Sequence, residues 1–319
     1  MQISVIVPVA NLLIYKPFTY GGLQFLPASD FTDSETSDTS IGPSENNIWD
    51  ELESGNLSKA ISAITGVSKK DFQKFSNVVF DLNIPDFDLN NPKRNDDEYI
   101  LAQALIRTER TLDLLKFDYA RLDITQYTPM AAGFLPSLNY LAIYLYDRSQ
   151  FIQRIIAREP ENSLSIPGLG LELENTPEEC QVAPLVLESF SEDTLGRRLQ
   201  RLLRIFGQTF TATSDDQKIL NLIFALDGLL TLEDSKSQQF KEAVEFWLRD
   251  ISMEKFSNFY RDVRNPLVHR GFSYEELGRN RQKDLLYIQR IVALLLTNLM
   301  PYRNMNFNEF WKKHSKAAG

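Results

Sequence analysis

The residues best suited to chemistry stand together in the segment Arg264-Asn265-Pro266-Leu267-Val268-His269. His269 is one of only two histidines, and the imidazole side chain has an ordinary pKa near neutrality, which suits it to take or give a proton. Arg264 keeps its charge and can donate two parallel hydrogen bonds to a phosphate. Asn265 could orient the histidine or bind phosphate. The segment therefore predicts a polar site for proton transfer and anion binding.

The backbone around this segment can also be predicted. Pro266 disfavours helix at Asn265 and suits a first helical position, so we expect Asn265 to cap a short helix. A structural interpretation stands beside the chemical one. In it Asn265 is only a cap, Arg264 pairs with Asp262 or Glu254, and the histidine closes a helical bundle.

Only helical patterns follow Phe190 in the sequence. Apolar residues recur every three or four positions, which keeps them on one side of each helix. Ser214 and Gln217 form the S-x-x-Q pattern of a capping box at the start of one helix. Five helices are predicted, over 195–210, 214–230, 240–248, 256–263 and 279–302. Short connections between them predict a bundle that presents Arg264 and His269 near its fourth and last helices.

The part before Phe190 mixes both kinds of element. Strands are predicted at 2–8, 18–26, 77–82 and 137–146, a helix at 96–117, and either element at 151–158. A polar loop at 28–47 and a short helix at 48–64 are predicted between the strands 18–26 and 77–82. The segment 160–184 is expected to connect two domains. The fold class is therefore α+β. We expect a mixed α+β domain over 1–185, whose residues name no function, and a helical bundle over 190–319.

Charge is distributed unevenly along the chain. The net charge is −9, yet residues 194–319 hold 20 Lys and Arg against 14 Asp and Glu, while residues 1–193 hold 14 against 29. A basic second part indicates a polyanionic partner, and attraction between the two parts is an equally good explanation. Arg197, Arg198, Arg201 and Arg204 share one helix face, which is either simply solvated or a stripe that contacts RNA.

Membrane, disulfide and metal features are weak in this sequence. The longest apolar stretch, 291–300, is far below the roughly 20 residues that cross a bilayer, and the N-terminus lacks the basic region of a signal peptide. Cys180 is the single cysteine, which excludes a disulfide within the chain and fits a reducing compartment. Metal-binding and nucleotide-binding motifs are missing. We therefore expect a cytoplasmic protein without a membrane segment or cofactor.

The R-N-x3-H pattern of Arg264, Asn265 and His269 resembles the signature of HEPN domains, which are small helical bundles. The surrounding residues look like the Apea-like branch of that family. They are Ala225-Leu226-Asp227-Gly228-Leu229-Leu230, then Phe246-Trp247-Leu248, then the motif and a long final helix. The resemblance covers the helical part alone. Where the family often shows Glu, this chain has Asp227.

Many HEPN proteins are metal-independent endoribonucleases that act as dimers with two facing motifs. Others have lost catalysis and serve as RNA-binding or interaction modules, and several Apea-like members are linked to bacterial defence against phage. The resemblance implies RNA as substrate, a homodimer formed through the helical domain, and a phage or regulatory protein as a partner of the N-terminal domain. It implies Arg264, Asn265 and His269 as catalytic residues, and RNA contacts from Arg261, Arg270, Arg197, Arg198 and Arg201.

Overall fold

The computed structural model describes residues 1–9, 11–27, 76–88, 93–120, 122, 143–147, 150–156, 171–178, 180–210, 214–230, 244–248 and 251–315. The chain divides into two compact units, Met1–Leu112 with Gly133–Glu179 and Asp113–Ala132 with Cys180–Gly319. This division assigns 113–132 and 180–185 to the second unit, in contrast to the predicted domains 1–185 and 190–319. The predicted loop 28–47 and helix 48–64 lie outside the described residues, as does the segment 160–170.

The first unit is built on an antiparallel sheet with strand order β3-β4-β5-β1-β6-β7. Its centre is β1 (Gln2–Val9), which pairs with β5 (Ser76–Asn83) on one side and β6 (Ile143–Asp147) on the other. Valine and isoleucine run through β1, and all but its first residue are buried. Strands 2–8 and 77–82 are confirmed, and the ambiguous segment 151–158 contains a strand, β7 (Gln150–Ile156).

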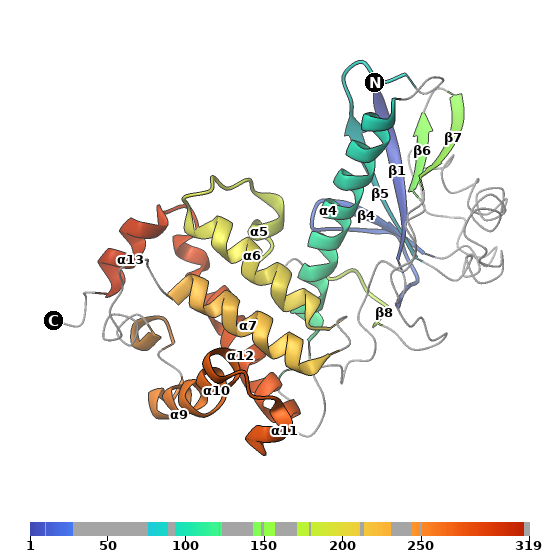
Figure 1. Cartoon of the computed structure of the whole chain (residues 1–319). Helices are drawn as coiled ribbons and strands as arrows, with labels where there is room; N and C mark the ends of the chain where they lie inside the picture. Colours follow the sequence, from blue (N-terminus) through green and yellow to red (C-terminus); the bar gives the residue numbers. More distant parts are fainter. Residues whose placement is uncertain are drawn as a thin grey trace. The chain divides into compact units, whose positions relative to one another are not determined.

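A tight hairpin forms the end of this sheet. It joins β3 (Phe18–Tyr20) to β4 (Leu23–Leu26) through Gly21 and Gly22, whose φ angles are +57° and +76°. Two successive positive φ values are characteristic of the hairpin turns that glycine favours. The Gly21 carbonyl accepts a hydrogen bond from Thr111 of the helix α4 (Arg94–Tyr119). Figure 1 shows α4 lying along the sheet, where the Arg107 guanidinium stands 5.4 Å from the Phe80 ring.

A second, two-stranded sheet pairs β2 (Leu12–Ile14) in parallel with β8 (Leu171–Leu173). The strand β8 lies inside the segment 160–184, which the sequence predicts only as a connection. Its three residues are too few for an alternating pattern to stand out among the neighbouring prolines and glycines. The α+β class is confirmed, with an antiparallel sheet in the N-terminal region and helices after it.

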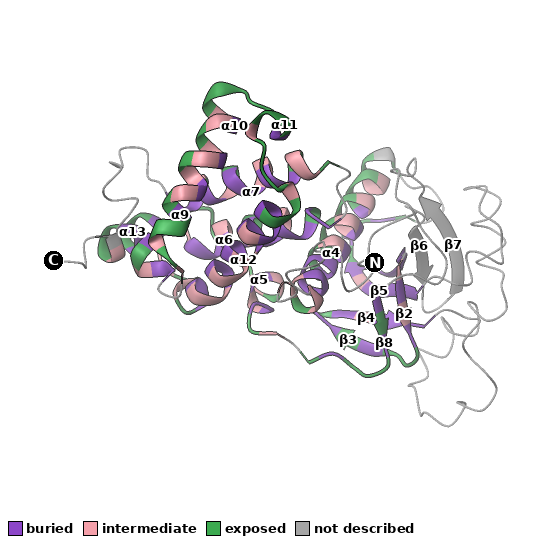
Figure 2. Ribbon diagram, turned by 90° about the horizontal axis from the view of Figure 1, so that it is seen from below, coloured by how far each residue is buried: buried purple, intermediate pink, exposed green. Residues whose placement is uncertain are grey.

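The second unit is helical. Its core is formed by α6 (Leu195–Gln208), α7 (Asp215–Leu230) and α12 (Arg281–Leu299), whose buried leucines and isoleucines pack together (Figure 2). Around it lie α5 (Pro184–Leu187), α9 (Met253–Phe259), η2 (Tyr260–Arg264), α10 (Asn265–Arg270), α11 (Tyr274–Leu277), η3 (Met300–Tyr302) and α13 (Phe307–Ser315). Ser214 caps α7 through the backbone N–H of Gln217, as predicted, while the Gln217 side chain turns to Asn221.

The helix α12 corrects one expectation. Together with η3 it spans Arg281–Tyr302, and by length and composition this segment could cross a membrane. The uncharged stretch 291–300 is only the last part of this apolar segment, so a prediction from that stretch alone underestimates its length. More than half of the most apolar window is buried inside the unit, so α12 serves as its core helix.

The C-terminal helix α13 carries the second histidine, His314, near its end. Its imidazole packs against the rings of Phe310, Tyr302 and Phe246, with centroid distances of 4.6, 5.0 and 4.8 Å. Burial lowers the pKa of His314. Its packing among these rings gives His314 a structural role in holding α13 to the unit.

Candidate functional site

The motif lies on a continuous helical run from α9 through η2 to α10. Asn265 has helical angles, φ −64° and ψ −43°, and its backbone N–H donates to the carbonyl of Tyr260, five residues earlier. The predicted cap at Asn265 is therefore wrong. A π turn replaces the cap, because the wider turn accommodates the Pro266 ring, which in a regular α-helix would clash with the carbonyl of Asp262. The run ends at Gly271, whose φ is +67°.

An ion pair to α7 holds Arg264 in place. Its Nη2 and Nε lie 2.5 and 3.2 Å from Oδ2 of Asp227. The side chains are 20% and 21% exposed, so water screens the pair only in part. The partner of Arg264 is therefore neither Asp262 nor Glu254. Although aspartate is shorter than the glutamate often found in HEPN domains, its carboxylate reaches the arginine.

The other end of the guanidinium faces the two remaining motif residues. Nη1 of Arg264 lies 3.2 Å from Oδ1 of Asn265 and contacts Nε2 of His269. His269 itself is exposed. Because a guanidinium can only donate, Nε2 is placed as the acceptor in this contact. The structure thus brings Arg264, Asn265 and His269 together at one exposed position.

Tyr260 completes the site, and the sequence reasoning missed it. Its half-buried phenol donates to Oδ1 of Asp227 over 3.2 Å, and its ring centre lies 5.8 Å from Cζ of Arg264. Burial, followed by the charge of Asp227, raises the pKa of Tyr260 well above its ordinary value, so the phenol keeps its proton. The available signal was its position four residues before Arg264, which places neighbours on one helix face.

The arginines predicted to contact RNA differ in how much of their charge is free. Arg261 pairs with Asp262 at 2.7 Å. Arg197 and Arg201 both pair with Glu192, at 2.8 and 2.9 Å. Within the described parts of the chain, Arg270 is exposed and has no carboxylate partner.

The remaining predicted arginine, Arg198, packs inside the unit. Its guanidinium lies 3.7 Å from the centre of the Phe307 ring and donates to the carbonyl of Gly228 over 2.6 Å. Burial and the charge of Arg201 lower its pKa. Arg198 therefore joins α6 to α7 and α13, and the predicted basic face is largely occupied by contacts within the protein.

Comparison with known proteins adds no relative. The chain matches no protein-family model, no curated protein and no solved structure. The resemblance to HEPN domains rests on the motif residues and on the helical pattern around them. What these residues can do is therefore argued from their own geometry.

Proposed function

We propose that this chain is a metal-independent endoribonuclease of the HEPN type. The observation that carries the proposal is the exposed imidazole of His269 beside the guanidinium of Arg264, which Asp227 holds from its other side. A proton acceptor and a fixed positive charge next to each other are the two groups that RNA transesterification needs, because RNA supplies its own nucleophile.

In the proposed reaction Nε2 of His269 accepts the proton of the 2′-hydroxyl, and the 2′-oxygen attacks phosphorus. The bond from phosphorus to the 5′-oxygen breaks, and the leaving oxygen takes a proton from the second motif of the proposed dimer. Nη1 of Arg264 donates to a phosphate oxygen as negative charge develops. The products are a 2′,3′-cyclic phosphate and a 5′-hydroxyl. General base catalysis of this kind contributes about 10²–10⁴-fold.

The contact between Arg264 and His269 bears on the activation of the base. Nη1 of Arg264 contacts the nitrogen of His269 that would act as base. A phosphodiester between the two side chains would attract Nη1 to its own oxygens and free the lone pair of Nε2. Substrate binding and activation of the base would therefore occur together.

The wider proposal follows the family resemblance. The enzyme would be cytoplasmic and would form a homodimer through its helical unit. The N-terminal unit would bind a phage or regulatory protein, and the nuclease would act in antiviral defence.

A second candidate is a non-catalytic HEPN module that binds RNA or mediates dimerisation. The observation that favours it is the complete engagement of Arg264, all three of whose guanidinium nitrogens contact groups of the protein itself. This set of contacts is also expected if Arg264 has only a structural role, in which it joins α7 to the helical run of α9, η2 and α10.

Cleavage of end-labelled RNA in EDTA tests the proposal. The purified full chain is compared with His269→Ala, Arg264→Ala and, as a control for lost positive charge, Lys313→Ala, which removes an exposed lysine of α13. We expect cleavage by the wild type and the control, and loss of at least 10²-fold in both motif variants. Equal cleavage by all four proteins would indicate a contaminant and refute the assignment.

The substrate can be chosen to test the nucleophile as well. A DNA strand with a single ribonucleotide should be cut at that residue, leaving a 2′,3′-cyclic phosphate, and the all-DNA strand should stay intact. RNA binding without cleavage, weakened in Arg264→Ala, would favour the non-catalytic module.

A further inference from the structure

Tyr260 and Arg264 bond to different oxygens of the Asp227 carboxylate. The phenol of Tyr260 donates to Oδ1 over 3.2 Å. Both arginine nitrogens that bond to this carboxylate, Nη2 at 2.5 Å and Nε at 3.2 Å, do so at Oδ2. A guanidinium and a carboxylate in contact frequently form two parallel hydrogen bonds that use both oxygens. The tyrosine therefore occupies the oxygen that such a fork would need.

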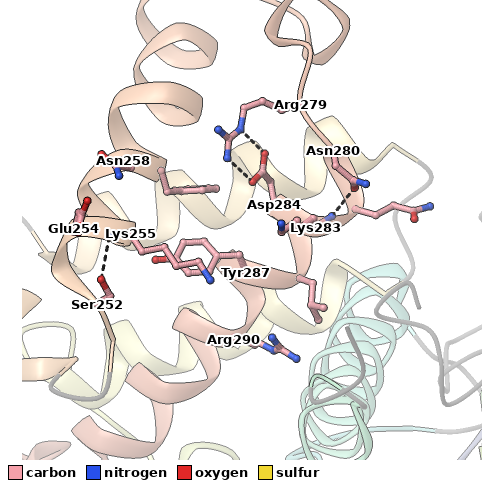
Figure 3. A pocket seen from close by; sticks show the side chains of 13 residues that line it. Ser252, Glu254, Lys255, Asn258, Arg279, Asn280, Lys283, Asp284, Tyr287 and Arg290 are labelled. Carbon is pink, nitrogen blue, oxygen red and sulfur yellow. Dashed lines mark hydrogen bonds and ion pairs between the residues drawn. The ribbon is translucent and has the colours of Figure 1, made fainter. Parts of the chain in front are cut away.

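A second set of tyrosine, aspartate and arginine in the helical unit forms this fork. Beside a pocket between α9 and the start of α12, Nε of Arg279 lies 2.8 Å from Oδ2 of Asp284 and Nη2 lies 2.9 Å from Oδ1 (Figure 3). The phenol of Tyr274 donates to Oδ2 over 3.3 Å, so Oδ1 stays available to the arginine. The residue types are the same at both places, and the oxygen that the phenol takes is different.

The contacts at Asp227 also set the direction of the guanidinium. The two distances at Asp284 are nearly equal, whereas those at Asp227 differ because both nitrogens converge on one oxygen. A guanidinium is planar and rigid, so its tilt determines where Nη1 lies. In Arg264 this nitrogen contacts Nε2 of His269 and lies 3.2 Å from Oδ1 of Asn265. The choice of carboxylate oxygen thus affects the nitrogen that faces the histidine.

Two features hold the phenol of Tyr260 in place. Its ring packs against the rings of Phe256 and Phe259, with centroid distances of 4.7 and 6.3 Å. Its backbone carbonyl accepts the N–H of Asn265 in the π turn, which ties residue 260 to the motif a second time. Burial, followed by the charge of Asp227, raises the pKa of the phenol well above its ordinary value, so it remains a donor at neutral pH.

We propose that Tyr260 is a positioning residue of the ribonuclease site. By occupying Oδ1 of Asp227, it directs Nη1 of Arg264 toward the histidine. Without the phenolic hydroxyl, Asp227 would rotate and form a fork with Arg264 like the one at Asp284. The ion pair would be at least as strong as before, and Nη1 would leave its contact with His269. The effect on the reaction rests on the proposed ribonuclease function, whereas the effect on the placement of Arg264 does not.

Imidazole ¹⁵N NMR of the full chain in EDTA tests the placement directly. The chain has two histidines, so His269→Gln assigns the signals. At about pH 8.5, where an ordinary imidazole is neutral, the Nε2 signal reports whether this nitrogen accepts a hydrogen bond. Arg264→Ala gives the signal without the contact. We expect Tyr260→Phe, which removes one oxygen atom, to move the signal most of the way to that position. Tyr274→Phe removes the same atom from the second set and should leave the signal unchanged.

Two further measurements separate positioning from a purely structural role. In the Tyr260→Phe background, the coupling between Asp227→Asn and Arg264→Gln in denaturation should be at least as large as in the wild type, because the fork replaces the contact with one oxygen. With RNA as substrate, kcat of Tyr260→Phe should fall at least about tenfold with little change in KM, since a misplacement of about 1 Å can cost about 10²-fold. Tyr274→Phe should cleave as the wild type does.

The inference is overturned by a His269 signal that stays at its wild-type position in Tyr260→Phe, or that Tyr274→Phe moves equally. A weaker coupling in the Tyr260→Phe background would also overturn it, because the phenol would then only support the ion pair. An unchanged kcat in an active enzyme would refute the role in the reaction. If the wild type does not cleave RNA, the proposed ribonuclease function fails, and the NMR signal still decides whether Tyr260 places Arg264. Circular dichroism of each variant verifies its fold.

Discussion

The ion pair between Asp227 and Arg264 should be the main force that positions the motif. We propose to measure it with a double-mutant cycle of Asp227→Asn and Arg264→Gln. Hydrogen bonds to a charged group contribute about 1.5–3 kcal/mol, and an exposed fraction near 20% for each side chain argues for the lower part of that range. The amide oxygen of Asn can still accept from Tyr260, so the cycle isolates the arginine contact. We expect a coupling energy of about 1–2 kcal/mol.

Tryptophan fluorescence during denaturation provides the assay. Trp247 and Trp311 are each 2% exposed and lie in the helical unit, so their signal reports the unfolding of that unit. Replacing the third tryptophan, Trp49, by Phe in every protein removes its contribution. This restriction matters because a chain with two units need not unfold in one transition.

A second cycle on the same helical run is the control. Arg261 and Asp262 form an ion pair of 2.7 Å, but their side chains are 69% and 38% exposed. Such a pair should couple by no more than about 0.5 kcal/mol. If the coupling between Asp227 and Arg264 were equally small, the view that the carboxylate holds the arginine would be wrong. With the proposed nuclease, Asp227→Asn should also slow cleavage by about 10²-fold through misplacement of Arg264.

Three further changes test the packing around the site. Pro266→Ala should restore the regular helix near Asp262. We expect the variant to unfold with a free energy about 1 kcal/mol higher than the wild type and to cleave or bind RNA more weakly. An unchanged free energy of unfolding would contradict this account of the π turn. The folded pKa of Tyr287 lies near 12, above its unfolded value of about 10, so stability is complete below pH 10 and falls as pH rises towards 12. Unfolding curves of Tyr287→Phe should show a smaller fall over that window. Gly207→Ala should lower the melting temperature markedly, because a Cβ there would lie 2.1 Å from a buried oxygen of Asp113.

Periodic and β-branched patterns allowed the large elements to be predicted. The strand β1 and the helix α12 are long, apolar and regular, so local sequence and burial favour the same structure. The helix α13 has a polar composition, and it is held by Phe310 and His314 contacting distant rings. Tertiary contacts of this kind leave no periodic signal in a short window.

The structure of the motif also depends on tertiary contacts that its own residues do not reveal. Its three residue types identify a polar site, but whether Asn265 caps a helix or continues one depends on the π turn that forms around Pro266. Propensity alone favours the cap, since a proline one residue later normally ends or begins a helix. The continuous helix prevails because its neighbours Phe259, Val263 and Leu267 are all buried and hold the run against the core.

The division of contacts around Arg264 determines how easily the site can open. Nε and Nη2 stay with Asp227, while Nη1 alone contacts His269. A phosphate therefore has to displace one charge-assisted hydrogen bond, from Nη1 to an exposed histidine, and the ion pair can stay intact. The bond that replaces it joins the guanidinium to a phosphate oxygen that is itself charged, so it adds the attraction between opposite charges. The balance favours substrate over the closed contact, and the held arginine is then already in place for the transition state.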